Sequence, residues 1–337
     1  MQAYIVPKGS SHIDELRRVE RGEPAVGPGQ VLLRVRAASL NYRDQAVVAG
    51  RYIGGPVSRD LIPLSDGAGE VMAIGSNVTQ VKVGDRVAAT FFQRPLDGSP
   101  LSPAAALGSP FDGILAEQIV VWEDGVVPLP KGYSFEEGAC LPCAGVTAWH
   151  ALMLAGRPVK PGDTVLVLGT GGVSILALQL ARAMGALVIA TSSSDQKLER
   201  VKGLGATGLI NYRRTPEWDK EVLRLTGGRG VDCVIEVGGV STMPLSFNSL
   251  ARGGKVCMIG VLGGPEGAVN PFLLAGRGGN LHGIFVGDRE MFQQMNRAIE
   301  VNGIKPVVDK VFPFNDAVSA YRAHAVGEFV GKVVITV

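Results

Sequence analysis

The segment from Asp163 to Ser174, DTVLVLGTGGVS, constrains the fold of this chain more than any other stretch. Val165 to Leu168 form a continuous apolar run, which is typical of a buried parallel strand. The glycines that follow permit a sharp turn and a close approach of the backbone to a pyrophosphate, whose charge the amide groups of the next helix can bind. The segment therefore predicts a strand, a phosphate-binding turn and a helix.

The predicted contacts to a dinucleotide come from Gly169, Thr170, Gly171, Gly172 and Val173. Glycine is common in this chain, at 46 of 337 residues, so the glycine pattern alone is weak evidence for dinucleotide binding. The residues around it provide the stronger evidence. An amphipathic helical pattern and a second apolar strand follow it directly. Ser174 stands where the dinucleotide fingerprint has its third glycine, and a serine is still small enough for close packing of the helix on the strand.

Composition narrows the class of protein. The chain has 46% hydrophobic and 19% charged residues, as expected for an ordinary globular protein with room for two domains. Its net charge of +2 and the lack of a basic stripe argue against nucleic acid as a partner. The first residues, MQAYIVPKGS, do not resemble a secretory signal, so we expect a cytoplasmic location. The most apolar region is interrupted by glycines, Gln179 and Arg182, which argues against a membrane span.

Four cysteines are too few and too dispersed for a disulfide framework: Cys140, Cys143, Cys233 and Cys257. The first two form a CxxC pair within ACLPCAGVTAW. Because this segment is apolar, its composition favours packing over redox or metal chemistry.

The chain changes character along its length. Up to about Val121, short runs of alternating apolar and polar residues are separated by glycine and proline turns, which predicts a β-rich, barrel-like domain. The stretch from Phe91 to Asp112 is rich in proline, serine and glycine and predicts a long loop, which either covers a site or is a surface excursion. A helix is expected from about Phe135 to Leu154. The predicted domains are a substrate domain over 1–127, a dinucleotide-binding domain over 128–287 and a return to the first domain over 288–337.

Strand and helix units alternate in the second of these domains. Strands are predicted at Thr164 to Leu168, Leu187 to Thr191, Leu209 to Asn211, Val231 to Val237, Lys255 to Ile259 and Leu281 to Val286. Helices are predicted near Gln196 to Leu204, Glu217 to Thr226, Thr242 to Leu250 and Arg289 to Asn302. This alternation predicts a doubly wound parallel sheet.

The end of the second strand indicates which cofactor binds. An acidic residue at this point commonly binds the ribose hydroxyls of NAD, but here the strand ends in the neutral TSSSDQK, with Asp195 inside the next helical turn. Ser193, Ser194 and Lys197 offer the donors and the positive charge that a 2′-phosphate needs, which favours NADP(H). Ser193 and Gln196 also fit a helix capping box, and a cap and a phosphate site use the same helix terminus.

Several short motifs are spread over nearly the whole chain: NYRD at Asn41 to Asp44, SDGAGEV at Ser65 to Val71, VGDRV at Val83 to Val87, LPCAGVTAW at Leu141 to Trp149, the glycine turn, INY at Ile210 to Tyr212 and GKVV at Gly331 to Val334. Together they resemble the medium-chain dehydrogenase/reductase superfamily, and specifically its zinc-independent quinone oxidoreductase-like branch. The resemblance implies an α/β fold, with a Rossmann doubly wound parallel sheet and a GroES-like β-barrel domain. It also implies a homodimer or homotetramer.

The resemblance bears on zinc. In zinc-bearing relatives the position of Asn41 is a cysteine ligand, and a histidine precedes the glutamate in the segment that resembles SDGAGEV; this chain has Ser65 and Asp66 there. A catalytic zinc needs about three protein ligands and a structural zinc about four. The stretch from Phe91 to Asp112 contains no cysteine and the four histidines are scattered, so we expect no zinc.

The resemblance also implies site residues. Ser193, Ser194, Lys197 and Tyr212 would surround the adenosine phosphate, Thr147 and Asn41 would lie near the nicotinamide, and Gly260, Val261, Phe285 and Val286 would line the ring end of the cofactor groove. Simpler roles fit some of them: Thr147 as a helix hydroxyl bonded to its own backbone, Tyr212 as a strand-end aromatic, and Phe285 as a core residue.

Without a metal there is no obvious Lewis acid for simple alcohols, so conjugated acceptors such as quinones and α,β-unsaturated carbonyls are the expected substrates. The candidate catalytic residues are Asn41, Tyr42, Asp44 and Tyr52. Tyr52 would orient the acceptor oxygen, and Asp44 is expected to hold a helix start through backbone bonds. An alcohol dehydrogenase-type enzyme and a non-catalytic NADPH-binding protein are the alternatives.

Overall fold

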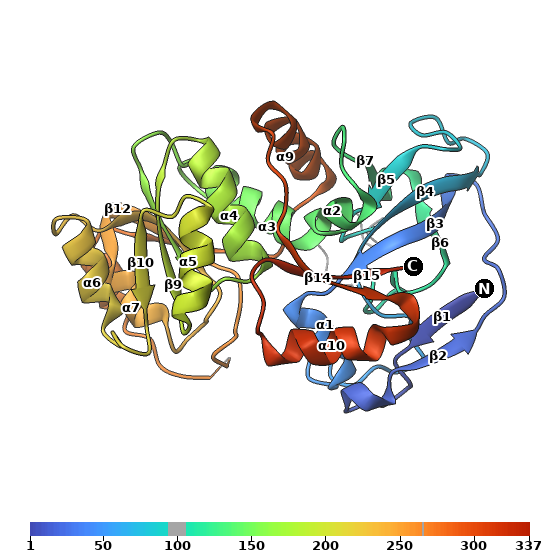
Figure 1. Cartoon of the computed structure of the whole chain (residues 1–337), viewed down its shortest axis with the longest axis horizontal. Coiled ribbons are helices and arrows are strands. Elements are labelled where there is room, and N and C mark those ends of the chain that lie inside the picture. Colours follow the sequence, from blue (N-terminus) through green and yellow to red (C-terminus); the bar gives the residue numbers. More distant parts are fainter. Residues whose placement is uncertain (94–105, 265) are drawn as a thin grey trace. The chain divides into compact units, whose positions relative to one another are not determined.

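The apolar run before the glycine turn forms β8 (Thr164–Leu168) in the computed structural model, which describes residues 1–93, 106–264 and 266–337 (Figure 1). The chain divides into two units: Met1–Val146 together with Gly287–Val337, and Thr147–Val286. The strand β8 belongs to the second unit. Residues 94–105 of the loop expected between Phe91 and Asp112 lie outside the described residues.

The second unit contains a six-stranded sheet in the order β10-β9-β8-β11-β12-β13. The other strands are β9 (Leu187–Ser192), β10 (Gly208–Asn211), β11 (Val231–Glu236), β12 (Leu250–Met258) and β13 (Asn280–Gly283). All neighbouring pairs are parallel, so the predicted doubly wound sheet is confirmed. The last strand is shorter than predicted, because the chain has left the sheet before Val286, whose φ is +54°.

Helices pack on this sheet. They are α4 (Gly172–Ala183), α5 (Asp195–Gly203), α6 (Trp218–Leu225), α7 (Met243–Asn248) and α8 (Pro271–Gly276). Leu166 and Leu168 of β8 share a buried cluster with Trp218 of α6 and Phe247 of α7. The alternate residues of β8 are equally buried and face the opposite side of the sheet, since successive side chains in a strand alternate. The helix α8 was not predicted; Asn270 caps its start and Pro271 occupies its first turn.

The helix predicted from Phe135 to Leu154 is interrupted. It consists of α2 (Phe135–Ala139), a wide-turn helix η4 (Leu141–Gly145), α3 (Val146–Trp149) and a second wide-turn helix η5 (His150–Leu154). Pro142 explains the first break, because proline has no N–H to donate and its ring crowds the preceding turn.

The first unit is built on a sheet in the order β14-β15-β3-β4-β5-β7, with β6 also paired to β3, and a separate pair β1-β2. The strands are β1 (Gln2–Ile5), β2 (Arg17–Glu20), β3 (Gln30–Ser39), β4 (Asp66–Ile74), β5 (Arg86–Ala89), β6 (Gln118–Trp122), β7 (Val126–Pro128), β14 (Val308–Pro313) and β15 (Lys332–Thr336). Its helices include α1 (Tyr42–Val48), α9 (Arg289–Asn302) and α10 (Ala317–Val326).

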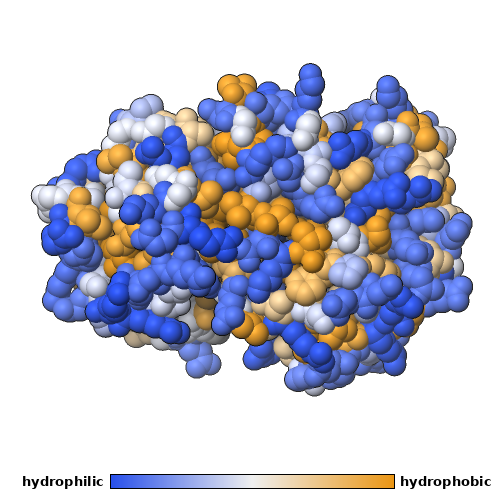
Figure 2. Space-filling view, in the orientation of Figure 1, coloured by the Kyte–Doolittle hydropathy of each residue, from blue (hydrophilic) through white to orange (hydrophobic). Residues whose placement is uncertain are grey.

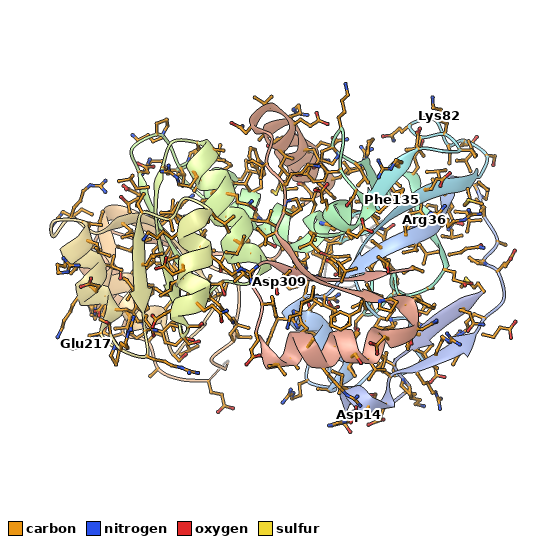
Figure 3. The ribbon with its side chains drawn as sticks, viewed as in Figure 1. Asp14, Arg36, Lys82, Phe135, Glu217 and Asp309 are labelled. Atoms are coloured by element: carbon orange, nitrogen blue, oxygen red, sulfur yellow. The ribbon has the colours of Figure 1, made fainter. Side chains whose placement is uncertain are left out.

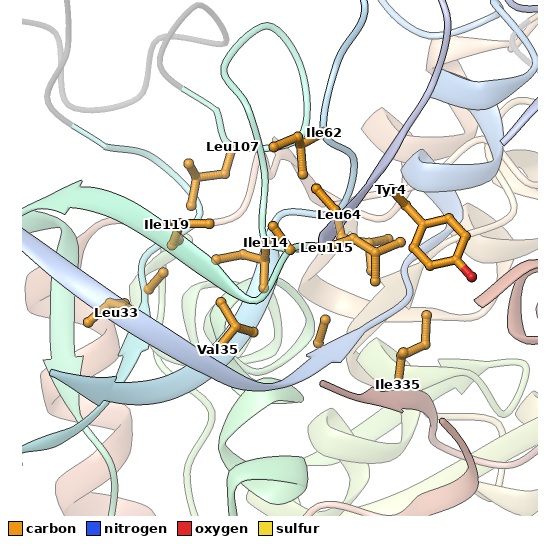
Figure 4. Packing of buried hydrophobic residues seen from close by; sticks show 14 of the residues in the cluster. Tyr4, Leu33, Val35, Ile62, Leu64, Leu107, Ile114, Leu115, Ile119 and Ile335 are labelled. Carbon is orange, nitrogen blue, oxygen red and sulfur yellow. The ribbon is translucent and has the colours of Figure 1, made fainter. Parts of the chain in front are cut away.

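The interior of the first unit is an apolar cluster that draws on strands far apart in the sequence (Figure 4). Leu33 and Val35 of β3 are almost completely buried, as are Leu115 from the segment before β6 and Ile335 of β15. The chain end is held here because β15 pairs antiparallel with β3, with Val334 opposite Ser39. This register places the start of β15 beside the residues that follow β3.

Polar and charged residues cover most of the face seen in Figure 2. Many of these charges are paired locally, for example Arg322 with Asp14 at 2.5 Å and Lys220 with Glu217 at 2.5 Å; Figure 3 labels both acids. Among the helices of the described residues, none is long and apolar enough to cross a membrane.

Candidate functional site

The cofactor residues predicted in the second unit gather at one edge of its sheet. Because all six strands are parallel, their carboxyl ends meet at the same edge, where parallel sheets bind their ligands. The turn Gly169–Val173 follows β8; Ser193, Ser194 and Lys197 follow β9; Tyr212 follows β10; Gly260 and Val261 follow β12; Phe285 and Val286 follow β13. Thr147 lies elsewhere, buried in α3.

The glycine turn leaves its backbone open. Gly169 has φ of +74°, a left-handed conformation that glycine adopts without strain. A Cβ at Gly169 or Gly171 would meet nothing within 4 Å, and Gly171, the N-cap of the 12-residue helix α4, provides no side-chain cap. The N–H groups of the first turn are therefore open to an anion, and the residues present fit a dinucleotide pyrophosphate.

Ser174 has a packing role that explains its departure from the glycine fingerprint. Its side chain is 2% exposed, and its hydroxyl donates a hydrogen bond of 2.6 Å to the carbonyl oxygen of Leu168 at the end of β8. The serine ties the first turn of α4 to the strand. It preserves the close contact that the third glycine of the fingerprint otherwise provides.

The capping box predicted from Ser193 and Gln196 is wrong by one residue. Ser194 caps α5, and its Oγ accepts a hydrogen bond from the Lys197 amide at 3.4 Å. The chain stays extended for one residue more than predicted, so Ser193 remains in the connection between β9 and α5.

Asp195, the acid nearest to the end of β9, is already paired. Its Oδ1 lies 2.5 Å from the Arg214 guanidinium and accepts a 2.8 Å hydrogen bond from Asn211. Tyr212 follows the register pair Asn211 and Ser192, and its amide donates to the Ser192 carbonyl at 3.0 Å. The structure thus brings Tyr212 beside the serine-rich end of β9.

A buried carboxylate that the sequence analysis missed shapes the loop after β11. Glu236 is fully buried and accepts hydrogen bonds from the amides of Gly238 at 2.7 Å and Gly239 at 3.1 Å, and from the hydroxyls of Thr242 at 2.7 Å and Ser246. The loop after β12 is bonded to this one through the Gly263 amide and the Gly238 carbonyl at 2.8 Å. Glu236 therefore holds the first loop in shape, and the backbone bond joins this loop to the second, which carries Gly260 and Val261.

Val286 is strained. Its φ of +54° is rare for a β-branched residue, and such strain persists only where neighbouring contacts hold it. Here its carbonyl oxygen lies 2.7 Å from His150 Nδ1. Because a carbonyl only accepts, Nδ1 carries the proton. Phe285, which precedes it, is half-buried.

The candidate catalytic residues lie in the first unit, with Asn41, Tyr42 and Asp44 at the start of α1 and Tyr52 beyond its end. Asn41 is the N-cap, and its backbone amide donates a 2.7 Å hydrogen bond to Asp44, the helix-holding role expected of this acid. Tyr42 is 49% exposed. Tyr52 is half-buried, and the guanidinium of the buried Arg43 lies 4.8 Å from its ring centroid.

Arg43 was not predicted as a site residue. It lies between two aromatic rings, since it is also 4.7 Å from the ring centroid of Phe91. Its guanidinium donates to the carbonyl oxygens of Leu107 at 2.8 Å and Ser109 at 3.1 Å. It therefore connects α1 and Tyr52 to the described end of the segment predicted as a long loop.

A second polar group surrounds Lys332, which also escaped the sequence analysis. Its Nζ donates to Asn41 Oδ1 at 2.6 Å and lies 3.9 Å from Asp66 Oδ2. Asp66 is fully buried and accepts hydrogen bonds from the Ser65 hydroxyl at 2.7 Å and the Cys143 amide at 3.0 Å.

The cysteines of the CxxC pair are free thiols. Burial raises the pKa of Cys140 to about 12 and raises that of Cys143 as well. Both therefore stay protonated at neutral pH. Among the described residues, no three His, Cys, Asp or Glu side chains are grouped to hold a metal ion.

Two family models match successive parts of the chain: "Alcohol dehydrogenase GroES-like domain" over residues 27–131 and "Zinc-binding dehydrogenase" over residues 172–300. The chain is 45% identical to the zinc-type alcohol dehydrogenase-like protein C1773.06c of Schizosaccharomyces pombe, covering 99% of both. The chain belongs to the medium-chain dehydrogenase/reductase superfamily. It is also 31% identical to the quinone oxidoreductase of Sus scrofa, covering 89% of this chain and 86% of that one.

Solved structures of related proteins share the fold of this chain. A crystal structure titled "NAD-dependent alcohol dehydrogenase" matches with a TM-score of 0.91 at 34% identity, covering 100% of both chains. Mycobacterial Rv1454c, solved with NADPH, matches with a TM-score of 0.84 at 29% identity over 100% of both chains. The chain is therefore an NAD(P)-dependent oxidoreductase by family.

The acid that holds α1 gives a pH prediction. Complete burial raises the pKa of Asp44 to about 6, although Arg43 and the Asn41 amide act in the opposite direction. In the unfolded chain this pKa is about 4, so between about pH 4 and 6 only the folded protein keeps the proton. Raising the pH through this window lowers the free energy of unfolding.

Asp44→Asn removes this ionisation and keeps an oxygen for the Asn41 amide. We expect the free energy of unfolding of the variant, relative to the wild type, to rise by roughly 2 to 3 kcal/mol between pH 4 and pH 7, measured by urea denaturation. Asp288→Asn is the control, because Asp288 also caps a helix, α9, but is not fully buried. A difference that stays constant or falls with pH would contradict the assignment.

Proposed function

We propose that this protein is an NADPH-dependent reductase of conjugated carbonyl compounds, quinones or enones, that works without zinc. The observation that carries the proposal is the ammonium group of Lys332 beside Asn41 and Asp66. In zinc-bearing relatives, these positions belong to the motifs that supply metal ligands. Here the Asn41 oxygen is bound to a lysine at 2.6 Å, and the same ammonium lies 3.9 Å from Asp66.

The donor set at these positions does not fit a zinc ion. The Ser65 hydroxyl donates a hydrogen bond to Asp66, and the Asn41 oxygen already accepts one from Lys332. Zinc binds thiolates, imidazoles and carboxylates, so Asp66 and Cys143 are the two ordinary ligand types among Asn41, Ser65, Asp66, Cys143 and Lys332, fewer than the three that a catalytic zinc needs. The matched model is described as a zinc-binding dehydrogenase, but its range of 172–300 contains none of them.

A nicotinamide cofactor supplies a hydride when it is bound. The open backbone of Gly169 and Gly171, with the first turn of α4, would hold its pyrophosphate. Ser193, Ser194, Lys197 and Tyr212 would hold the adenosine phosphate, as proposed from the sequence. Phe285 and Val286 would line the ring end.

The end of β9 supports NADPH over NADH. Selection for NAD uses a carboxylate that binds ribose hydroxyls. Here the carboxylate of Asp195 is engaged by Arg214 and Asn211, which neutralises its charge and leaves a hydroxyl-rich strand end. Among solved relatives, Rv1454c was crystallised with NADPH, whereas the alcohol dehydrogenase is titled NAD-dependent.

The first unit provides groups that suit a conjugated acceptor. A quinone or an α,β-unsaturated carbonyl spreads the arriving negative charge onto its own oxygen, so the protein has only to orient the acceptor and donate hydrogen bonds. The Tyr52 hydroxyl and the Asn41 amide are neutral donors of this kind. The Arg43 guanidinium below the Tyr52 ring keeps this side chain in place.

A panel of substrates tests the proposal. We expect NADPH oxidation with quinones and enones, no reduction of NADP⁺ with simple alcohols, and much less than one zinc per chain by elemental analysis of the purified protein. The names of the relatives favour alcohol dehydrogenase as the second candidate. Stoichiometric, tightly bound zinc, with alcohol oxidation that a chelator abolishes, would overturn the proposal in favour of that candidate.

The phosphate assignment gives a second prediction. Lys197→Ala should weaken NADPH binding about 10- to 100-fold, because a charge-assisted hydrogen bond to phosphate contributes about 1.5 to 3 kcal/mol, and should leave NADH binding within about twofold. Lys202→Ala is the matched control, since Lys202 lies in the last turn of the same helix, α5. Dissociation constants from fluorescence titration decide the matter. Equal losses for both cofactors would remove the assignment.

A further inference from the structure

Lys332 is a buried lysine whose ammonium is held by backbone and side-chain oxygens. It is 3% exposed, and its Nζ donates to the Leu40 carbonyl at 2.7 Å and to Asn41 Oδ1 at 2.6 Å. The fold explains this position. The amide of Leu40 donates to the Val333 carbonyl at 3.0 Å, continuing the pairing of β15 with β3, so Lys332 lies beside the residues that follow β3.

The bond to Lys332 fixes which way the Asn41 amide points. An ammonium group donates hydrogen bonds and cannot accept them, so the Asn41 atom that faces it must be Oδ1. The orientation is therefore set by chemistry, although oxygen and nitrogen of an amide look alike. The backbone of Asn41 is fixed as well, through its bond to Asp44.

The other end of this amide has no partner. Nδ2 of Asn41 is buried and makes no hydrogen bond with any described residue. Buried donors are almost always satisfied, and an unsatisfied one destabilises the protein that holds it. Asn41 as a residue is only half-buried, so this donor lies close beneath the surface.

We propose that Lys332 is a positioning residue that holds the Asn41 amide so that Nδ2 donates a hydrogen bond to a neutral carbonyl-type oxygen of a bound ligand. The ligand is either the carboxamide of the nicotinamide cofactor or the carbonyl substrate. This inference rests on the proposed function for the identity of these ligands. Lys332 also lies 3.9 Å from Asp66, and a role limited to balancing that charge is the alternative.

A double-mutant cycle separates positioning from charge balance. Lys332→Met should weaken ligand binding about tenfold, as should Asn41→Ala, but the double variant should bind no worse than Asn41→Ala alone, because Lys332 acts through Asn41. Asn41→Asp keeps an oxygen for Lys332 and replaces the donor with an acceptor, so it should bind as poorly as Asn41→Ala. Equal effects of Lys332→Met in both backgrounds would overturn the proposal.

The readouts distinguish the two ligand sources. The dissociation constant of NADPH, measured by fluorescence titration without substrate, tests the carboxamide of the cofactor. The KM for a quinone at saturating NADPH tests the substrate carbonyl. A higher dissociation constant for NADPH assigns the carboxamide as the ligand of Asn41 Nδ2. A higher KM for the quinone with an unchanged dissociation constant for NADPH assigns the substrate carbonyl. No loss in either for Asn41→Asp would overturn the proposal.

Folding and the proposed function are controlled separately. Lys332→Met leaves the Asp66 carboxylate without its cation, so the cycle is repeated in the background of Asp66→Asn, where that charge is absent; thermal unfolding reports whether each variant is folded. If the wild type reduces no quinone or enone but its NADPH binding follows the predicted cycle, the proposed function fails and the positioning role stands. If the wild type reduces quinones or enones but the effects of the two substitutions are additive, the proposed function stands and the positioning role fails.

Discussion

The reversal of strand order at β8 is the constraint on which the second unit depends. After β8 the chain adds β9 and β10 on one side and then crosses to place β11 on the other side. At such a point the connections from two neighbouring strands lead to opposite faces of the sheet, which leaves room for a ligand beyond their carboxyl ends. Gly169 and Gly171 keep the β8 side of this room open, and the buried Glu236 holds the β11 side in shape.

The first unit meets a different physical demand, because it carries charge in its interior. Arg43, Asp44, Asp66 and Lys332 are each less than a tenth exposed. Buried charges lower stability unless they are paired or hydrogen-bonded, and replacing them with apolar residues is often stabilising. These four residues lie near Asn41 and Tyr52, the residues proposed to contact substrate. The stability lost by burying their charges is therefore lost at the place where a ligand would have to be oriented.

Local patterns predicted much of the second unit. The apolar run and glycines from Asp163 to Ser174 gave the strand, turn and helix, because short-range sterics and burial determine all three. The capping error at Ser193 is of one residue, within a run of serines that all suit the cap. Glu236 could have been found, since an acid that ends an apolar strand before a glycine pair has few partners other than the turn itself.

The contacts that specialise the first unit could not be predicted in this way. Lys332 and Asn41 are 291 residues apart, and their meeting depends on how β15 pairs with β3. Arg43 reads as a surface charge at a helix start, yet it is buried between Phe91 and Tyr52. Arg43 and Lys332 lie in motifs that carry the family resemblance, NYRD and GKVV, but those motifs do not reveal these contacts. Tertiary pairing, and not local pattern, decides such contacts.

The most direct measurement is the affinity of the wild-type protein for NADPH and NADH, titrated under the same conditions, with 2′,5′-ADP and 5′-AMP as competitors. If the serine-rich end of β9 binds the adenosine phosphate, NADPH binds at least about tenfold more tightly than NADH, since one charged hydrogen bond accounts for that ratio. In that case 2′,5′-ADP also displaces NADPH far better than 5′-AMP does. Equal or tighter binding of NADH, with the two competitors equally effective, would contradict it.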